Sequence, residues 1–171
     1  FNGQGDLLYR NRGDGTFEDV SERSGISLGG ANDGKGLGVL AADFDGDGLQ
    51  DLYVANDTTS NFLWRNRGNG TFVDVAHEWG IALSSDGRTQ AGMGVDGADI
   101  NGDGWLEIHV TNFSRETNNL FMREAPGSYT EAVQGSSLGR SFDRLGFGTV
   151  FGDFDLDGDL DLSIANGHVD D

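Results

Sequence analysis

The sequence has no cysteine and a single proline among its 171 residues. Without cysteine the chain forms neither disulfides nor thiolate zinc sites, so the fold must depend on core packing or on metal bound through oxygen. Basic residues are scarce as well: 11 stand against 29 acidic residues, for a formal net charge of −18. That charge repels nucleic acid and anionic lipid and makes cations the natural partners.

Long apolar runs are also missing, since no window approaches the roughly 20 apolar residues that a membrane-spanning helix requires. The chain opens at Phe1 without a basic and apolar leader. We therefore expect a soluble chain, a mature or excised segment with no membrane span and no nucleic-acid partner. Glycine, by contrast, is abundant at 29 residues, which indicates many turns and close approaches of the backbone.

The chain aligns with itself at a nearly constant period. Three glycine-rich segments superpose without a gap and begin 56 and 54 residues apart, at Gly36, Gly92 and Gly146. Each leads into an acidic loop and then into a short run with strand-like alternation, as in Leu52 to Asn56. Similarity at a fixed period is typical of repeat architectures and takes precedence over any local assignment.

A second pair of strand-like runs belongs to each period. Residues 63–75 surround the turn Arg67-Gly-Asn-Gly70, and residues 8–20 surround Arg12-Gly-Asp-Gly15 in the same way. Such turns between alternating apolar residues predict β-hairpins. Residues 120–131 keep the pattern in degraded form.

Four short strands in each period fit a blade of a β-propeller. We predict an all-β fold of four-stranded, propeller-type blades, about three blade equivalents in a single repeat domain spanning residues 1–171. Its expected parts are an outer half-blade at 7–20, blades at 36–75 and 92–133, and an inner half-blade at 146–166. The two half-blades are complementary, and each leaves a strand edge of the kind that proteins normally pair or cover.

Three acidic loops carry the chemistry. Oxygen-bearing side chains recur at positions 1, 3, 5 and 9 of residues 43–51, 99–107 and 153–161, with glycine at position 6. A hard cation such as calcium takes 6 to 8 oxygen ligands, and a tight loop can converge alternate side chains on one point. Position 7 varies in side chain, which favours its backbone carbonyl as a ligand. The residues predicted to contact three calcium ions are Asp43, Asp45, Asp47, Leu49, Asp51, Asp99, Asn101, Asp103, Trp105, Glu107, Asp153, Asp155, Asp157, Asp159 and Asp161.

These loops do not have the EF-hand pattern, which places a glutamate at position 12 between two helices. Position 12 is here Val54, Val110 or Ile164, each within a strand-like run. Magnesium is an alternative ion, but its demand for near-ideal octahedral geometry favours calcium. A further alternative, in which aspartate and glycine only form solvated turns, is disfavoured by the three aligned copies.

The strand, the D-x-D-x-D-G-x-x-D loop and the next strand resemble FG-GAP (VCBS-type) repeats, which build the calcium-binding propeller of integrin α chains. The pattern L-Y/W-R-N-R-G-D/N-G-T-F-x-D-V and the segment from Ala165 to Val169 are similar to the cartilage-acidic-protein and ASPIC/UnbV group. This resemblance covers nearly the whole chain. It implies calcium ligands at positions 1, 3, 5 and 9 and at the position 7 carbonyl, and a complete propeller of about seven blades. Asn101 and the longer Glu107 depart from the pattern, so the second site should be weaker or differently shaped.

Two other motifs have simpler interpretations. Arg12-Gly13-Asp14 spells a tripeptide known for integrin adhesion, but its repeat-mate Arg67-Gly68-Asn69 lacks the aspartate, which favours turn chemistry. Glycosylation sequons begin at Asn56, Asn69 and Asn112. Each of these asparagines occupies a recurring position of the repeat, so a structural role already accounts for it.

The histidines and two of the tryptophans fall outside the repeat pattern. His77, His109 and His168 occupy non-equivalent positions without a paired nucleophile, so no catalytic constellation can be assembled. We expect His109 to pack between blades or to face solvent. Trp79 and Trp105 have no aromatic repeat-mates, which makes them candidates for a surface contact.

Together these features predict a calcium-binding module for protein binding or self-assembly, extracellular or periplasmic, with structural calcium and no enzymatic activity. The expected partner is a protein, including copies of the chain joined through unpaired blade edges into a ring or a head-to-tail filament. The alternative is the propeller part of a longer secreted enzyme, or of a carbohydrate-binding or adhesion protein. An enzyme would need a pocket with acids that no metal uses, whereas the clustered acids are already assigned to the loops.

Overall fold

The computed structural model describes residues 2–27, 33–132 and 137–168, and the regular structure in these ranges is mostly β-strand. The expected all-β, blade-type fold is confirmed: two antiparallel four-stranded sheets are flanked by two two-stranded ones. Val133 and Val169, which the sequence patterns above include, lie outside the described residues.

Each four-stranded sheet is a simple meander in which consecutive strands are neighbours. The first contains β3 (Gly36–Ala42), β4 (Asp51–Asn56), β5 (Phe62–Asn66) and β6 (Phe72–Asp74), and the second contains β7 (Gly92–Ala98), β8 (Glu107–Asn112), β9 (Asn119–Ala125) and β10 (Ser128–Glu131). The two-stranded sheets are β1 (Tyr9–Asn11) with β2 (Phe17–Asp19), and β11 (Leu145–Gly152) with β12 (Asp161–Gly167). Two short helices, α1 (Ser21–Ser24) and the 3-10 helix η2 (Ser137–Ser141), complete the described structure.

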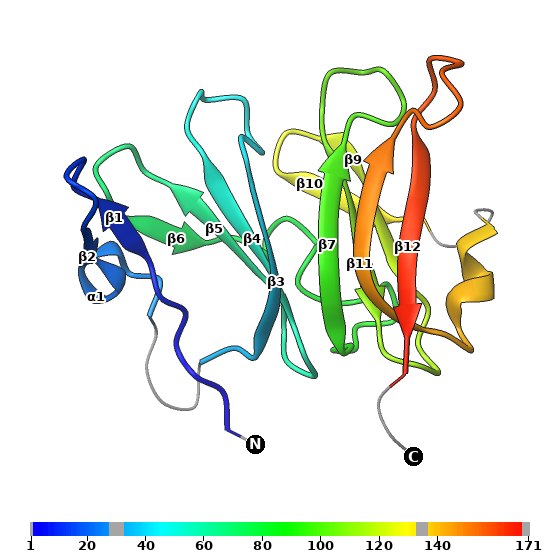
Figure 1. Ribbon diagram of the computed structural model, residues 1–171, viewed down its shortest axis with the longest axis horizontal. Coiled ribbons are helices and arrows are strands. Elements are labelled where there is room, and N and C mark those ends of the chain that lie inside the picture. The colour runs from blue at the N-terminus through cyan, green and yellow to red at the C-terminus, as the bar shows by residue number, and fades with distance from the viewer. Residues whose placement is uncertain (1, 28–32, 133–136, 169–171) are drawn as a thin grey trace.

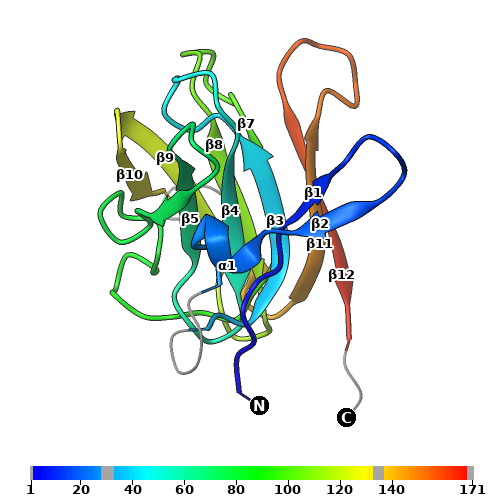
Figure 2. The same cartoon turned by 90° about the vertical axis from the view of Figure 1, so that its left-hand side faces the viewer.

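The four sheets stand in a row with β1–β2 at one end and β11–β12 at the other (Figure 1). Figure 2 looks onto the first end, where α1 and the β1–β2 hairpin lie in front. The first strands of successive sheets approach closely. A β-carbon on Gly38 of β3 would lie 2.5 Å from the carbonyl oxygen of Met93 in β7, so only glycine fits there. None of the helices in the described ranges is long and apolar enough to cross a bilayer.

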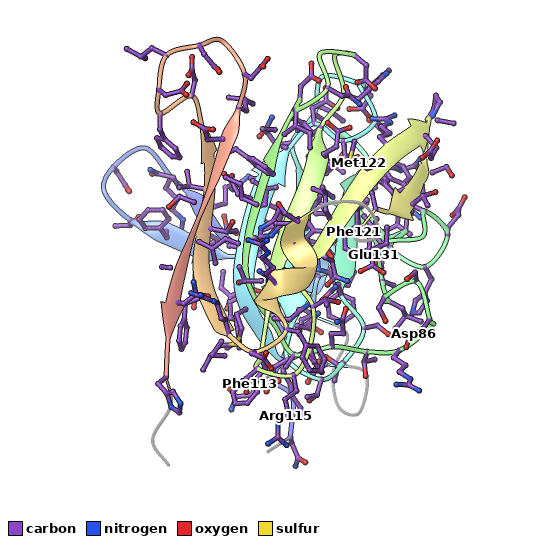
Figure 3. The ribbon with its side chains drawn as sticks, turned by 90° about the vertical axis from the view of Figure 1, so that its right-hand side faces the viewer. Asp86, Phe113, Arg115, Phe121, Met122 and Glu131 are labelled. Atoms are coloured by element: carbon purple, nitrogen blue, oxygen red, sulfur yellow. The ribbon has the colours of Figure 1, made fainter. Side chains whose placement is uncertain are left out.

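The main core lies between the two complete blades. Its largest buried side chains include Tyr53, Leu63, Ile108 and Phe121, which come from the second and third strands of both sheets. Figure 3 labels Phe121 on β9 together with Glu131, its register partner on β10. The strand alternation therefore places one face of each blade against its neighbour.

Trp79 corrects one expectation. It was a candidate for a surface contact, but it is only 5 % exposed and stacks on Tyr129, with ring centroids 6.4 Å apart. The segment that follows β6 carries Trp79 under the second sheet, so this side chain belongs to the core. Phe17 differs from expectation in the opposite direction. In the other hairpins the aromatic side chain of this repeat column fills space between blades, whereas Phe17, in the terminal hairpin, is 61 % exposed.

The hairpin tips follow the turn interpretation. Asp14 accepts hydrogen bonds from the backbone N–H and the hydroxyl of Thr16, at 2.9 and 2.6 Å. Asn69 does the same for Thr71, at 3.0 and 2.7 Å. The shared geometry explains why aspartate and asparagine alternate at this column.

The other repeated asparagines lie inside the protein. Asn56 and Asn112 are fully buried, and their side-chain amides donate to backbone carbonyls in the turn that leads to the third strand. Two of the three sequons therefore carry an asparagine that is inaccessible in the folded chain, whereas Asn69 is exposed.

His109 packs between blades. Its ring is fully buried, and its Nδ1 lies 2.8 Å from the hydroxyl of Thr149 on β11. Phe151 meets the ring edge-on at 6.1 Å between centroids. Burial lowers the pKa of His109 to about 4, although the nearby Asp96 carboxylate acts in the opposite direction. The ring is therefore a neutral part of the junction between the second blade and the last half-blade.

Candidate metal centres

Three acidic loops join the first strand of a sheet to the second: β3 to β4, β7 to β8, and β11 to β12. Figure 1 shows all three at the same end of the molecule, opposite the two chain ends. All fifteen predicted metal-contacting residues lie in these loops or at the first residue of the strand that follows.

The aspartate at position 1 organises each loop. Asp43 accepts backbone N–H groups from Gly46 and Asp47 through Oδ1 and from Gly48 through Oδ2, at 2.8, 3.2 and 2.8 Å. Burial acts to raise the pKa of Asp43, but these donors together hold it below its usual value. Asp99 accepts the three equivalent bonds in the second loop, and Asp153 accepts those from positions 5 and 6 in the third. The loop backbone therefore wraps around an ionised carboxylate.

Positions 3 and 5 complete the turn. Asp45 accepts the N–H of Asp47 at 3.1 Å, and Asp47 accepts the N–H of Leu49 at 2.8 Å. Asx-type bonds of this kind hold a side chain over its own backbone and leave the other carboxylate oxygen free. The second and third loops repeat the pattern with their own residues.

Position 9 lies at the start of the second strand. Asp51 is fully buried and accepts two backbone N–H groups, from Phe44 at 3.0 Å and from Asn66 of β5 at 2.7 Å. Glu107 receives the same two kinds of donor, from Ile100 at 3.0 Å and from the backbone of Arg123 on β9. The carboxylate at position 9 thus ties the loop to the third strand of its own blade.

Carboxylate oxygens converge in the first and third loops. One oxygen each from Asp43, Asp45 and Asp47 lies within 4.8 Å of the others, and Asp153, Asp155 and Asp161 form a similar group. Oxygen donors packed this closely suit a hard divalent cation, and calcium accepts such flexible clusters. Either group could hold a metal ion.

The second loop differs, because among the described residues no three acidic side chains of residues 99–107 converge in this way. Asn101 stands where the other loops have aspartate, and its amide donates to Asp103 at 3.1 Å and to Glu107 at 3.5 Å. A neutral donor therefore occupies the space between these two carboxylates. This arrangement agrees with the expectation that the second loop is differently shaped, and three equivalent sites remain a prediction.

Two of the position 9 carboxylates, Asp51 and Glu107, lie where the ionised form is disfavoured without a cation. Burial raises the pKa of Asp51, and the negative charges of Asp45 and Asp47 raise it further against the backbone donors. Burial and neighbouring carboxylates likewise raise the pKa of Glu107. A bound cation would offset both contributions and favour the ionised form.

The Trp105 side chain, which belongs to the second loop, packs against the first loop and is partly exposed to solvent. A β-carbon on Gly46 would lie 3.0 Å from the Trp105 ring, and the guanidinium of Arg123 lies over that ring at 3.7 Å from its centroid. Arg123 is nearly buried and also donates to the carbonyl of Phe44 in the first loop. The sequence repeat did not predict the role of Arg123, because its column is asparagine in the other hairpins.

A family comparison accounts for the repeat. The model of the FG-GAP-like repeat matches residues 1–54, 43–110 and 99–164, so consecutive matches overlap at an acidic loop. The chain belongs to the FG-GAP-like repeat family. The resemblance drawn from the loop spacing is therefore confirmed, and the blade-type sheets are those of this family.

The chain is also similar to cartilage acidic protein 1 from several vertebrates. It is 33% identical to the human protein over 171 aligned positions (94% of this chain, 24% of the relative) and 31% identical to the Xenopus tropicalis protein over 170 positions (94% and 25%). Identity to the mouse protein is 35% over 104 positions (61% and 15%). The chain spans about a quarter of the length of the human and frog relatives.

Proposed function

We propose that this FG-GAP repeat domain binds calcium in its acidic loops, that the ions are structural, and that the domain serves protein binding outside the cytoplasm, in an extracellular or periplasmic setting. The observation that carries the proposal is the convergence of three carboxylates in the first loop and three in the third. The family membership supports it, because every matched segment contains at least one of these loops.

A structural role follows from the position of the loops. Each loop links the first and second strands of a blade, and its position 9 carboxylate reaches the third strand where that strand is present. A cation that neutralises the loop therefore stabilises three strands together. We propose three ions, with the second loop binding most weakly because Asn101 supplies an amide in place of a carboxylate.

A binding role is favoured over catalysis. The clustered acids lie in the loops, and the one fully buried histidine contacts Thr149 and Phe151 within a blade junction. Screening the calcium-loaded protein against hydrolase substrates tests this part of the proposal, and reproducible turnover that is lost on unfolding would contradict it.

Calcium removal is the first test. At about 2 mM calcium and a dissociation constant of about 0.1 mM, typical of extracellular modules, linkage gives about 1.8 kcal/mol of stabilisation per site. We expect the melting temperature to fall when a chelator is added and to recover with excess calcium. A melting temperature that does not respond to either would refute structural calcium.

Metal counting tests the ligand assignment. Asp45→Ala and Asp155→Ala should each remove one bound ion, because each takes a carboxylate out of a converging group. Asp14→Ala is the matched control, since Asp14 makes a similar Asx-type bond at a hairpin tip but belongs to neither converging group of the described residues. Equal metal content in all three variants would show that the loops are not the sites.

A further inference from the structure

Arg123 connects two of the acidic loops, and both loops belong to blades that are complete in this chain. It lies on β9, next to Met122, which Figure 3 labels. Its backbone N–H donates to the Glu107 carboxylate at position 9 of the second loop, and its guanidinium donates to the carbonyl of Phe44 at position 2 of the first loop. One residue therefore holds a predicted calcium ligand of one loop and the backbone between two predicted ligands of the other.

The indole ring of Trp105 makes a second connection. Trp105 occupies position 7 of the second loop, and its backbone N–H donates to Asp103 at 2.9 Å. A β-carbon on Gly46, at position 4 of the first loop, would lie 3.0 Å from the ring, and the guanidinium of Arg123 lies over the ring at 3.7 Å from its centroid. The ring therefore contacts both the first loop and the Arg123 side chain.

The Arg123 side chain depends on both of these contacts. It is 6 % exposed, its Nε donates to the carbonyl of Ala125 at 3.4 Å, and its Nη2 is buried without a hydrogen-bond partner among the described residues. Burying a cation with an unpaired donor is costly, so the Phe44 carbonyl and the Trp105 ring must compensate. Because these two groups belong to different loops, a displacement of either loop leaves the guanidinium less well paired.

The first blade shows that this connection is not part of the ordinary repeat. Asn66 occupies the column of Arg123 there, and its side-chain amide donates to the carbonyl of Gln50, in the loop of its own blade, at 3.0 Å. Leu49 has the place of Trp105 and lies against the hairpin tip of the same blade. With asparagine and leucine in these columns the contacts stay within one blade, whereas arginine and tryptophan extend them to the preceding loop.

The third loop lacks such a connection to the second within the described residues. Gly102 is the repeat-mate of Gly46, and a β-carbon there would meet no atom within 4 Å. Position 7 of the third loop is Asp159, a short charged side chain in place of the indole. The third loop therefore provides a comparison within the same chain: it has converging carboxylates but no aromatic side chain that reaches the preceding loop.

We propose that the first and second loops bind calcium as a coupled pair, that Arg123 and Trp105 are the positioning residues that link them, and that the third loop binds independently. This inference rests on the calcium-binding function proposed above. Coordination in the second loop holds Glu107 and the Trp105 carbonyl, and with them the Arg123 side chain and the indole ring. The segment 44–46 of the first loop then has less conformational freedom to lose when its own ion binds, which raises the affinity of that loop. By linkage, the first loop raises the affinity of the second by the same factor.

Electrostatic repulsion acts in the opposite direction. Each bound cation reduces the negative potential that attracts the next one, and this effect applies to every pair of loops. Salt limits its range, since the screening length is about 8 Å at physiological ionic strength. Positive coupling that is confined to the first two loops therefore distinguishes the Arg123 and Trp105 contacts from a general effect of charge.

Calorimetric calcium titration of variants with disabled loops measures the coupling. Asp155→Ala disables the third loop, and in that background the intact pair is compared with chains that also carry Asp45→Ala or Asp103→Ala. We expect each loop of the pair to bind calcium at least about fivefold more tightly when the other is intact, which is the lower end of usual allosteric couplings. Asp103→Ala alone leaves the first and third loops, whose affinities should be independent. Affinities of the first two loops that do not depend on each other would overturn the proposal.

Arg123→Asn and Trp105→Leu test the linking residues, because each introduces the residue that the first blade has in the same column. Both variants keep the backbone N–H that Glu107 accepts and the carbonyl at position 7. The coupling factor should fall to about one while the number of bound ions stays the same. Asp159→Leu is the matched control, since it introduces the same leucine into the third loop and should leave the coupling unchanged. If Arg123→Asn and Trp105→Leu melt at a lower temperature but retain the wild-type coupling, these residues have a packing role only and the proposal is wrong.

Tryptophan emission provides a readout that does not rely on affinities. Trp64 and Trp79 are buried in the core, whereas Trp105 lies at the loops and is 36 % exposed. In Asp103→Ala, calcium binding to the first loop should still change the emission, because the Trp105 ring lies against Gly46. Adding Trp105→Leu should abolish this change. An equal change in emission after that substitution would contradict the contact between the loops.

Metal counting on the same samples separates this inference from the proposed function. A chain that binds calcium in the first and second loops without mutual dependence refutes the coupling alone. A chain that binds no calcium refutes the coupling and the calcium-binding function together.

Discussion

The first and third acidic loops have nearly the same pattern but lie in different surroundings. Asp51 of the first loop is fully buried beneath a third strand, whereas Asp161 of the third loop is exposed at a sheet edge. Both accept an N–H from their own loop, but only Asp51 also holds the third strand, through Asn66. The comparison teaches that the acidic loop alone forms the turn, and that the neighbouring strand makes it part of a core.

The same contrast extends along the strands. Val54 on β4 is 6 % exposed and packs against Phe62 and Trp64. Its repeat-mate Ile164 on β12 is only half-buried, since no third strand covers it within the described chain. Burial in this protein is therefore a property of blade completeness more than of residue type.

The largest effect should come from removing the carboxylate at position 9. Asp51→Ala leaves the N–H groups of Phe44 and Asn66 without an acceptor, and unsatisfied buried donors cost about 1–3 kcal/mol each. Relief of repulsion from the neighbouring acids offsets part of that cost, so we expect a loss of about 3 kcal/mol in chelator. Asp161→Ala frees only one exposed donor and should cost less than about 1 kcal/mol. Urea unfolding of both variants measures the difference, and equal losses would contradict the comparison.

Acid should weaken the junction that carries His109. The pKa of this histidine is about 4 in the fold and about 6.5 in the unfolded chain, so between these values the unfolded state binds more protons. Its contribution is fully present above pH 6.5 and is lost as the pH falls towards 4, by about 3 kcal/mol in total.

His109→Gln isolates this effect from the titration of the carboxylates. The variant can keep a hydrogen bond to Thr149 but cannot take up a proton, so its stability should fall less steeply between pH 6.5 and 4. His77→Gln is the matched control for the substitution itself, because His77 is exposed. Parallel curves for wild type and His109→Gln would refute the assignment.

Much of this architecture could be predicted from the sequence, because the residue pattern of each blade strand recurs several times along the chain. Gly36, Gly92 and Gly146 all lie at or next to the start of a first strand, and each acidic loop connects the expected strand pair. The position 1 aspartates could be recognised because their role is local: each binds backbone within five residues.

Features that depend on contacts between repeats could not be found in this way. Trp79 has no aromatic repeat-mate, and only the three-dimensional structure shows that it stacks on Tyr129, 50 residues away in the sequence. Arg123 replaces an asparagine of the hairpin column and inserts between Trp105 and the first loop. Both side chains break the repeat, and a pattern that relies on repetition predicts nothing for them.

The smallest effect concerns the turn of the third loop. Leu156 adopts a left-handed conformation, with φ of 65°, at the position where the other loops have Gly46 and Gly102, with φ of 81° and 76°. Left-handed backbone costs a residue with a β-carbon roughly 1–2 kcal/mol, and the greater freedom of glycine in the unfolded chain offsets about half of that. Leu156→Gly should therefore raise stability by about 0.5–1 kcal/mol, or about 1–4 °C in melting temperature for a chain of this length. Gly102→Leu is the matched reverse change, since Gly102 has open space around it, and it should lower stability by a similar amount. If Leu156→Gly were destabilising, the exposed leucine would have to make a contact that favours the folded state.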